Sequence, residues 1–178
     1  MEEMSNMKIA YLHGLESKVG GPKVDWLLLK GHNVISPKMD YSDVNTFRDT
    51  LHLLEMYKPD LIIGSSMGGW FAWNIGKLLK VPVLLYNPAI LAPTLIDAEL
   101  KDSKVFLALG TSDEVINPNQ TIKLLNMFDK HDFNMNNVWK GPHGHQTPLD
   151  SFQSAFLHFQ NNIKHNINLY KRYKSDKI

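Results

Sequence analysis

The sequence predicts an α/β protein, a parallel sheet of about six strands with helices on both faces. Short apolar runs alternate with helical patterns along the chain, as they do where each strand is followed by a helix that packs on the sheet. No internal repeat or low-complexity linker interrupts this alternation. The length of 178 residues suits one domain over 1–178, with a core at about 7–167 and a basic tail at about 168–178.

The predicted strands are short apolar runs bounded by turn-forming residues. Runs rich in Val, Ile, Leu and aromatic residues are typical of strands that are buried on both faces. The last run is the weakest of them. The runs lie at 8–12, 33–36, 60–64, 83–86, 104–109 and 137–139.

Helical patterns fill the intervals between these runs. Pro22 suits the first position of the first helix, and Gly31 suits its end. Ser42 is the candidate cap of the second helix, which must end before Pro59. Residues 88–103 are expected to form a loop with one short helix, which leaves little material for a lid. Further helices are expected at about 68–80, 118–129 and 148–166.

Composition and charge exclude several classes of function. The formal net charge of +1 indicates neither a nucleic-acid nor a membrane partner. The chain has no cysteine, which excludes disulfides, cysteine-bound metal and a thiol nucleophile. A signal-peptide pattern is absent, and no apolar run approaches the roughly 20 residues that cross a bilayer, so we expect a cytoplasmic protein. The basic residues at 170–174 could bind a partner, but a solvated terminus is the favoured interpretation.

The segment Gly64–Gly68 carries the strongest signal for chemistry. It matches the pattern G-x-S-x-G, in which the central serine occupies a sharp turn between a strand and a helix. An apolar strand precedes the segment and a helical pattern follows it, as the motif requires. The sequence therefore predicts an α/β-hydrolase fold with Ser66 as the nucleophile. Ser65 lacks the required spacing, and a plain Gly-Ser turn is the alternative without chemistry.

A serine nucleophile needs a base, and the base needs an acid that holds its tautomer. In this fold the order along the chain is serine, acid, histidine, each in a loop after a strand. Asp113 follows the fifth predicted strand and His145 follows the sixth, so order and placement both fit. Glu114 is the alternative acid and His143 the alternative base. We prefer His145 because the small Gly144 before it lets the imidazole swing over the serine.

Other interpretations of these side chains remain. Asp113 could be an ordinary turn residue, since aspartate is common in turns. His143 and His145 could form a metal-binding pair, but no acidic cluster accompanies them, and we expect neither a metal nor an organic cofactor. His13 is expected to have a structural role, with its ring hydrogen-bonded to loop backbone.

The backbone N–H groups of Met67 and Leu15 are the candidate oxyanion donors. Met67 follows the serine at the start of a helix, and Leu15 lies in the loop after the first strand, which supplies the second donor in this fold. Gly14 allows a tight turn in that loop. We place Gly14, Trp70 and Asn87 as candidates for the substrate pocket, although an aromatic residue on such a helix is more often part of the core.

Three segments also give the chain a family resemblance. Tyr11–Leu15 is followed at a typical spacing by Ser17 and Lys23, Ile63–Trp70 contains the serine turn, and Asn87–Ala89 follows the next strand. On these segments the chain resembles the small, lidless bacterial α/β-hydrolases of the YqiA/YcfP esterase type, over nearly its whole length. The resemblance implies the same nucleophile, acid and base, and carboxylesterase activity on short acyl esters.

The later part of the chain fits this resemblance less closely. Gly110–Val115 is similar to the acid loop of the family, whereas the histidine segment is the weakest match. Gly20-Gly21 and Gln146-Thr147 depart from the family pattern, so the resemblance does not extend to the shape of the acyl pocket.

The sequence as a whole predicts a serine hydrolase that cleaves small acyl esters through an acyl-enzyme. Its partner would be a small-molecule ester, and the protein would be a monomer or a homodimer. A thioesterase or an amide hydrolase could use the same triad. A non-catalytic binding protein could keep the fold without the reaction, because fold alone does not settle function.

Overall fold

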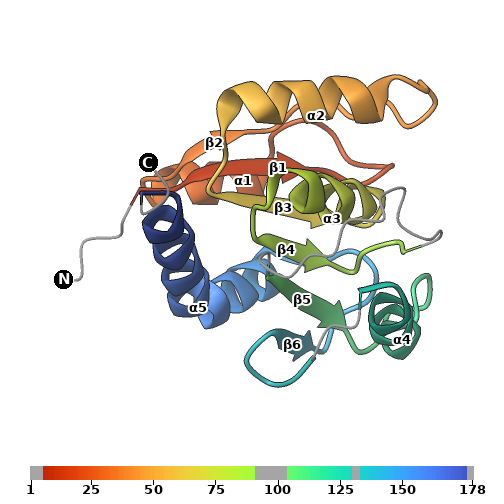
Figure 1. Cartoon of the computed structure of the whole chain (residues 1–178). Helices are drawn as coiled ribbons and strands as arrows, with labels where there is room; N and C mark the ends of the chain where they lie inside the picture. Colours follow the sequence, from red (N-terminus) through yellow and green to blue (C-terminus); the bar gives the residue numbers. More distant parts are fainter. Residues whose placement is uncertain (1–5, 91–103, 130–132, 176–178) are drawn as a thin grey trace.

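The computed structural model describes residues 6–90, 104–129 and 133–175. Within these residues a six-stranded sheet has the order β2-β1-β3-β4-β5-β6, and every neighbouring pair is parallel. Figure 1 shows this sheet between two layers of helices. The strands are β1 (Lys8–Leu12), β2 (Asn33–Ile35), β3 (Leu61–Ser65), β4 (Val83–Tyr86), β5 (Val105–Gly110) and β6 (Val138–Gly141).

The helices divide between the two faces of the sheet, and this confirms the predicted fold class. Apolar side chains of α1 and α5 join one core cluster, and those of α2, α3 and α4 join the other. The central strands β3, β4 and β5 are almost wholly buried, because helices cover both of their faces. The helices are α1 (Pro22–Leu29), α2 (Thr46–Tyr57), α3 (Met67–Leu79), α4 (Pro118–Asp129) and α5 (Leu149–Ser175).

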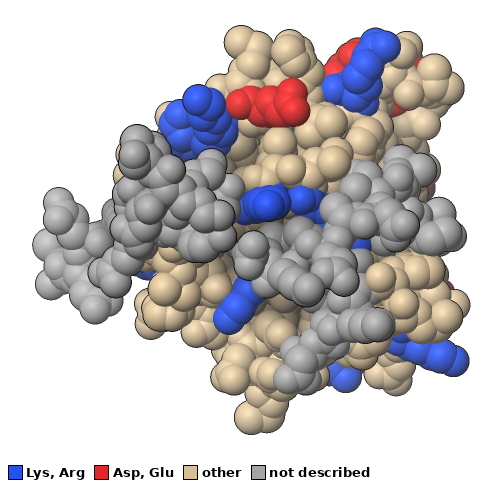
Figure 2. Space-filling model, viewed as in Figure 1, with Lys and Arg blue, Asp and Glu red and all other residues tan. Residues whose placement is uncertain are grey.

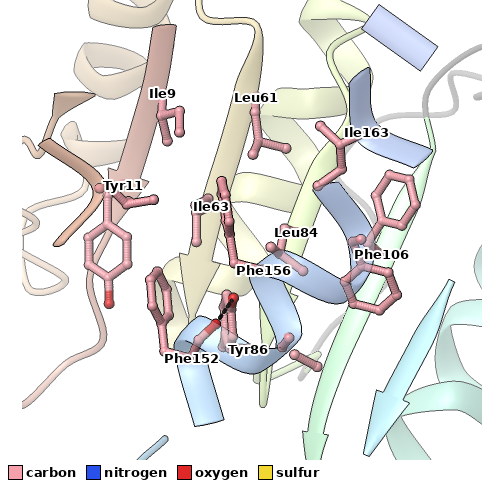
Figure 3. Packing of buried hydrophobic residues seen from close by; sticks show 14 of the residues in the cluster. Ile9, Tyr11, Leu61, Ile63, Leu84, Tyr86, Phe106, Phe152, Phe156 and Ile163 are labelled. Carbon is pink, nitrogen blue, oxygen red and sulfur yellow. Dashed lines mark hydrogen bonds between the residues drawn. The ribbon is translucent and has the colours of Figure 1, made fainter. Parts of the chain in front are cut away.

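Aromatic side chains of α5 fill the core beneath the sheet (Figure 3). Phe152 stacks on Tyr86 with ring centroids 4.7 Å apart, and the Tyr86 hydroxyl donates a hydrogen bond to the Phe152 carbonyl at 3.0 Å. Phe156 lies one helical turn further along and is fully buried. Each such burial contributes about 1.5–3 kcal/mol relative to an exposed side chain. The start of α5, which follows the loop of the candidate base, is therefore firmly attached to the sheet.

The second helix begins later than the sequence predicted. Ser42 is not its cap: α2 starts at Thr46. The side chain of Asp40 accepts hydrogen bonds from the backbone N–H and the hydroxyl of Ser42, and Asp43 accepts one from the backbone N–H of Asn45. Two aspartate-centred turns thus form where a helical turn was expected, because short polar side chains compete for backbone donors.

The last helix is longer than predicted. It continues to Ser175 instead of ending near Asn166, so most of the expected basic tail is helical. No glycine or proline follows Asn166 to stop the helix. The predicted short helix within 88–103, and with it the expected lack of a lid, falls largely on residues 91–103, which lie outside the described residues.

Charged side chains are spread over the surface. Figure 2 shows Lys and Arg side chains in several separate groups on one face, with acidic side chains near α2. None of the helices in the described part of the chain combines the length and the apolarity that a membrane crossing requires.

His32, which immediately precedes β2, makes the stability of the fold dependent on pH. Its ring is buried, it accepts a hydrogen bond from the Met7 N–H at 3.4 Å, and its Nε2 has no partner among the described residues. Burial, and then the charge of Lys164, lowers the pKa of His32 below 6.5. The unfolded chain therefore binds this proton more readily, and stability should fall as the pH drops below 6.5.

Urea unfolding at pH 5 and pH 7.5 would measure this effect. His32→Leu should reduce the pH dependence. His52→Gln should leave it nearly unchanged, because the side chain of His52 is 74% exposed and its ion pair with Glu55 lies at the surface. If the pH dependence of stability is unchanged in His32→Leu, other groups cause it.

Candidate active site

Ser66 sits at a strained turn between β3 and α3. Its φ of 53° and ψ of −119° are unusual for a residue with a side chain. Hydrogen bonds hold the turn on both sides: the Ser66 N–H donates to the Tyr86 carbonyl at 3.0 Å, and the Ser66 carbonyl accepts from the N–H groups of Ala89 and Gly69 at 2.9 Å each. The segment after β4 thus fixes the backbone of the serine.

Glycines allow the chain to pass this turn. A Cβ atom at Gly68 would lie 2.1 Å from the Leu12 carbonyl oxygen, and one at Gly64 would lie 2.4 Å from the Gly68 carbonyl oxygen. Contacts this short are impossible, so β3, α3 and the end of β1 approach one another only because these positions lack side chains. The spacing of glycines in the sequence motif has a steric cause in the structure.

Three side chains from separate loops meet at this turn. The Ser66 Oγ lies 2.9 Å from the His145 Nε2, and the His145 Nδ1 lies 2.9 Å from the Asp113 Oδ2. The side chain of Asp113 is 1% exposed and that of His145 is 22% exposed. Asp113 follows β5 and His145 follows β6, so the parallel order of the strands brings both loops to the edge at which β3 ends.

The position of these three side chains agrees with the topology of the sheet. From β1 the chain continues to β2 on one side, whereas from β3 it continues to β4 on the other. Loops after β1 and β3 therefore diverge, and open α/β sheets bind ligands at such a point. Gly14 lies in the loop after β1, where an added Cβ would be 3.2 Å from the Ser66 Cβ. That loop therefore passes directly beside the serine.

A family match accompanies this geometry. Residues 8–105 match the model of a family that is described as Uncharacterised protein family (UPF0227). The chain belongs to this family. The matched segment contains Ser66 and ends before Asp113 and His145. This result confirms the resemblance to the YqiA/YcfP type that the sequence motifs indicated. No curated protein sequence gave a match.

Solved structures share the fold of this UPF0227 chain. A protein from Xanthomonas campestris pv. campestris, described as a hydrolase of the alpha/beta superfamily, is 18% identical with a TM-score of 0.67, over 91% of this chain and 99% of that chain. Est1E from Butyrivibrio proteoclasticus is 10% identical with a TM-score of 0.67, over 94% and 90% of the two chains. The Bacillus cereus carboxylesterase is 18% identical with a TM-score of 0.59, over 93% and 91%. These likenesses show an α/β-hydrolase fold.

The alternative acid and base lie apart from the serine relay. His143 is buried, its Nδ1–H donates to the Gly144 carbonyl at 2.9 Å, and its ring stacks on Trp139 with centroids 6.0 Å apart. Glu114 is exposed. No group of three or more potential metal ligands occurs in residues 6–90, 104–129 and 133–175. The geometry therefore places His145 and Asp113, rather than their neighbours, against Ser66.

The loop after β1 is held by His13. The ring of this residue donates from Nδ1 to the Gly14 carbonyl at 2.8 Å, and its Nε2 accepts from the Met39 N–H at 3.1 Å. The predicted bonding to loop backbone is confirmed. The side chain of Leu15 is 66% exposed. Leu15 and Met67, which begins α3, remain the candidate oxyanion donors.

Two predicted pocket residues have other surroundings. Trp70 is half-buried in an aromatic cluster, with its ring 6.0 Å from Phe47 and 5.4 Å from Phe71. Asn87 is 2% exposed, which leaves its side chain little area for substrate. Asn87 is therefore too buried for the pocket position that the sequence predicted.

Asn87 instead joins the acid loop to the histidine loop. Its side-chain nitrogen donates to the carbonyls of Gly144 and His145 at 3.0 and 2.8 Å, and its side-chain oxygen accepts from the Gly110 N–H at 2.7 Å. Its φ of 41° lies in the left-handed region, which asparagine tolerates better than most residues. Sequence reasoning missed this role, although the Asn-Pro pair at the end of a strand indicates a constrained turn.

Asn87→Gly tests this positioning role. Glycine keeps the backbone freedom and removes only the side chain that joins the two loops. We expect ester hydrolysis to fall by about 10- to 100-fold, since small displacements of reacting groups have effects of this size. Asn119→Ala, an exposed change on α4, serves as the control. Full activity in a folded Asn87→Gly protein would show that these hydrogen bonds do not position the histidine.

Proposed function

We propose that this chain is a serine hydrolase that cleaves small carboxylic esters. The observation that carries the proposal is the continuous relay from the Ser66 Oγ through His145 to the Asp113 carboxylate, with 2.9 Å at each step. A hydroxyl is a weak nucleophile until a base removes its proton, and this arrangement supplies the base and its orienting acid. Hydrolases and esterases among proteins of the same fold support the reaction class.

The reaction begins with attack on the ester carbonyl. The Ser66 Oγ forms a bond to the carbonyl carbon while its proton passes to the His145 Nε2. The negative oxygen that develops accepts hydrogen bonds from the Met67 and Leu15 N–H groups, and the N-terminal end of α3 favours this charge. The carboxylate of Asp113 stabilises the imidazolium, which then protonates the departing alcohol.

Water completes the turnover. His145 removes a proton from a water molecule that attacks the acyl-enzyme. The imidazolium then returns this proton to the Ser66 Oγ as the C–O bond breaks and the acid is released. The sum is ester plus water to acid plus alcohol. No metal ion or organic cofactor takes part in these steps.

Labelling with a fluorophosphonate probe tests the nucleophile without a choice of substrate. We expect one probe per chain, on Ser66 in mapped peptides, and a loss of labelling in His145→Ala. Ser65→Ala, a change at the neighbouring serine, should still be labelled. An unlabelled native protein would contradict the proposal and favour a non-catalytic binding protein. Comparing matched esters, thioesters and amides would then identify the bond that is cleaved.

A further inference from the structure

A cavity of about 390 Å³ opens near the end of β1. The loop after β1, the first turn of α1 and the start of α5 form its walls. Ser17 links it to the nucleophile: an added Cβ at Gly14 would be 3.9 Å from the Ser17 Oγ and 3.2 Å from the Ser66 Cβ. The Ser17 Oγ in the cavity wall therefore lies at most about 7 Å from the Ser66 Cβ, and the volume of the cavity suits a small ligand.

Tyr11, in β1, supplies a polar group to this cavity. The residue is 5% exposed, and its ring packs edge-on against Phe152 with centroids 6.2 Å apart. Figure 3 shows its hydroxyl pointing away from the core cluster, toward the ends of the strands. None of the described residues forms a hydrogen bond with this hydroxyl. Burial raises the pKa of Tyr11 to about 12. The phenol therefore keeps its proton at neutral pH and can donate a hydrogen bond to an acceptor.

Lys23, in the first turn of α1, supplies a cation. Its Nζ lies 5.8 Å from the centre of the Phe152 ring, and it forms no ion pair within the part of the chain that the structure describes. Burial lowers the pKa of Lys23. Burial of an ammonium group without a carboxylate partner costs free energy, and a bound anion would offset this cost. Lys18 lies on the same wall, whereas Val19 and Leu149 contribute apolar surface.

We propose that this cavity binds an anionic end of the substrate, a carboxylate or a phosphate, while the ester lies at Ser66. Lys23 would neutralise the charge, and the hydroxyls of Tyr11 and Ser17 would donate hydrogen bonds to its oxygens. The apolar walls suit a short methylene chain between the anion and the ester. This inference rests on the proposed ester hydrolysis. It narrows the substrate class to esters that carry a second, negatively charged group, which passes through the reaction unchanged.

Calorimetric titration tests the cavity without reference to activity. Glutarate and propyl phosphate are the two probes, and the tighter of them identifies the preferred anion. We expect Lys23→Met to weaken that binding at least tenfold and Tyr11→Phe to weaken it several-fold. Lys30→Met, at an exposed lysine beyond the far end of α1, should bind as the native protein does. Absence of binding to the native protein, or equal binding by Lys23→Met, would overturn the inference.

Hydrolysis of two matched esters separates this inference from the proposed function. The 4-nitrophenyl monoester of glutaric acid carries a carboxylate, and 4-nitrophenyl valerate is its neutral counterpart. The native protein should prefer the charged ester in kcat/KM, and Lys23→Met should reduce this ratio at least tenfold. Cleavage of valerate without binding of either probe would refute the anion cavity alone. Binding of a probe without cleavage of either ester would refute the proposed function alone.

Discussion

Ser66→Ala should lower the hydrolysis of short-chain esters by about 10³-fold or more, while the fold stays intact. The substitution removes the Oγ that lies 2.9 Å from the His145 Nε2, and no acyl-enzyme can then form. The hydrogen bonds that hold the turn use the backbone of Ser66, so alanine retains them. Initial rates with 4-nitrophenyl acetate and circular dichroism would measure activity and fold in the same preparation.

Ser65→Ala is the matched control for this prediction. It removes a hydroxyl from the adjacent residue, at the end of β3, without touching the relay. We expect its rate to stay within a few-fold of the native rate. A folded Ser66→Ala protein with native activity would end the proposal that Ser66 is the nucleophile, and loss of activity in Ser65→Ala alone would transfer that role to Ser65.

Most of the fold could be predicted because its signals are local. Central strands covered on both faces must be apolar throughout, so their positions were visible in the sequence, and β4 was predicted at its observed bounds. The helix boundaries predicted from Pro22 and Gly31 are also confirmed. Helix α1 begins at Pro22, and Gly31, with φ of 84°, follows its end. The errors arose where signals compete. Ser42 resembles a helix cap, but Asp40 already accepts its N–H and hydroxyl.

The candidate site could be predicted only where its signals are local. The turn around Ser66 has a steric signature in glycine spacing, whereas the choice between His143 and His145 depends on contacts between distant segments. Trp139 holds the ring of His143, and no pattern near that histidine indicates the stacking. The hydrogen bonds of Asn87 could not be predicted from local sequence, since its partners lie in two loops that only the sheet order brings together.

Asp113→Asn should lower activity by about 10⁴-fold. The substitution replaces one carboxylate oxygen by an NH₂ group and hardly changes the shape of the side chain. The two oxygens of Asp113 have separate tasks. The Oδ1 accepts hydrogen bonds from the N–H groups of Val115 and Ile116 at 2.9 and 2.8 Å, and the Oδ2 faces the His145 Nδ1 at 2.9 Å. Asparagine can keep its carbonyl oxygen toward the two N–H groups, so the loop should retain its shape. Its NH₂ group then faces His145 in place of an acceptor.

The exchange of an oxygen for an NH₂ group favours the tautomer of His145 that cannot act as the base. With a donor opposite the Nδ1, the neutral ring must carry its proton on the Nε2, and it can no longer accept the proton of Ser66. Glu114→Gln makes the same chemical change on the exposed neighbouring residue and should leave kcat/KM nearly unchanged. Ester kinetics of both variants, with nitrogen-15 NMR of the imidazole to assign its tautomer, would measure the effect. Native kinetics in Asp113→Asn would mean that the buried carboxylate shapes the loop and has no part in the relay.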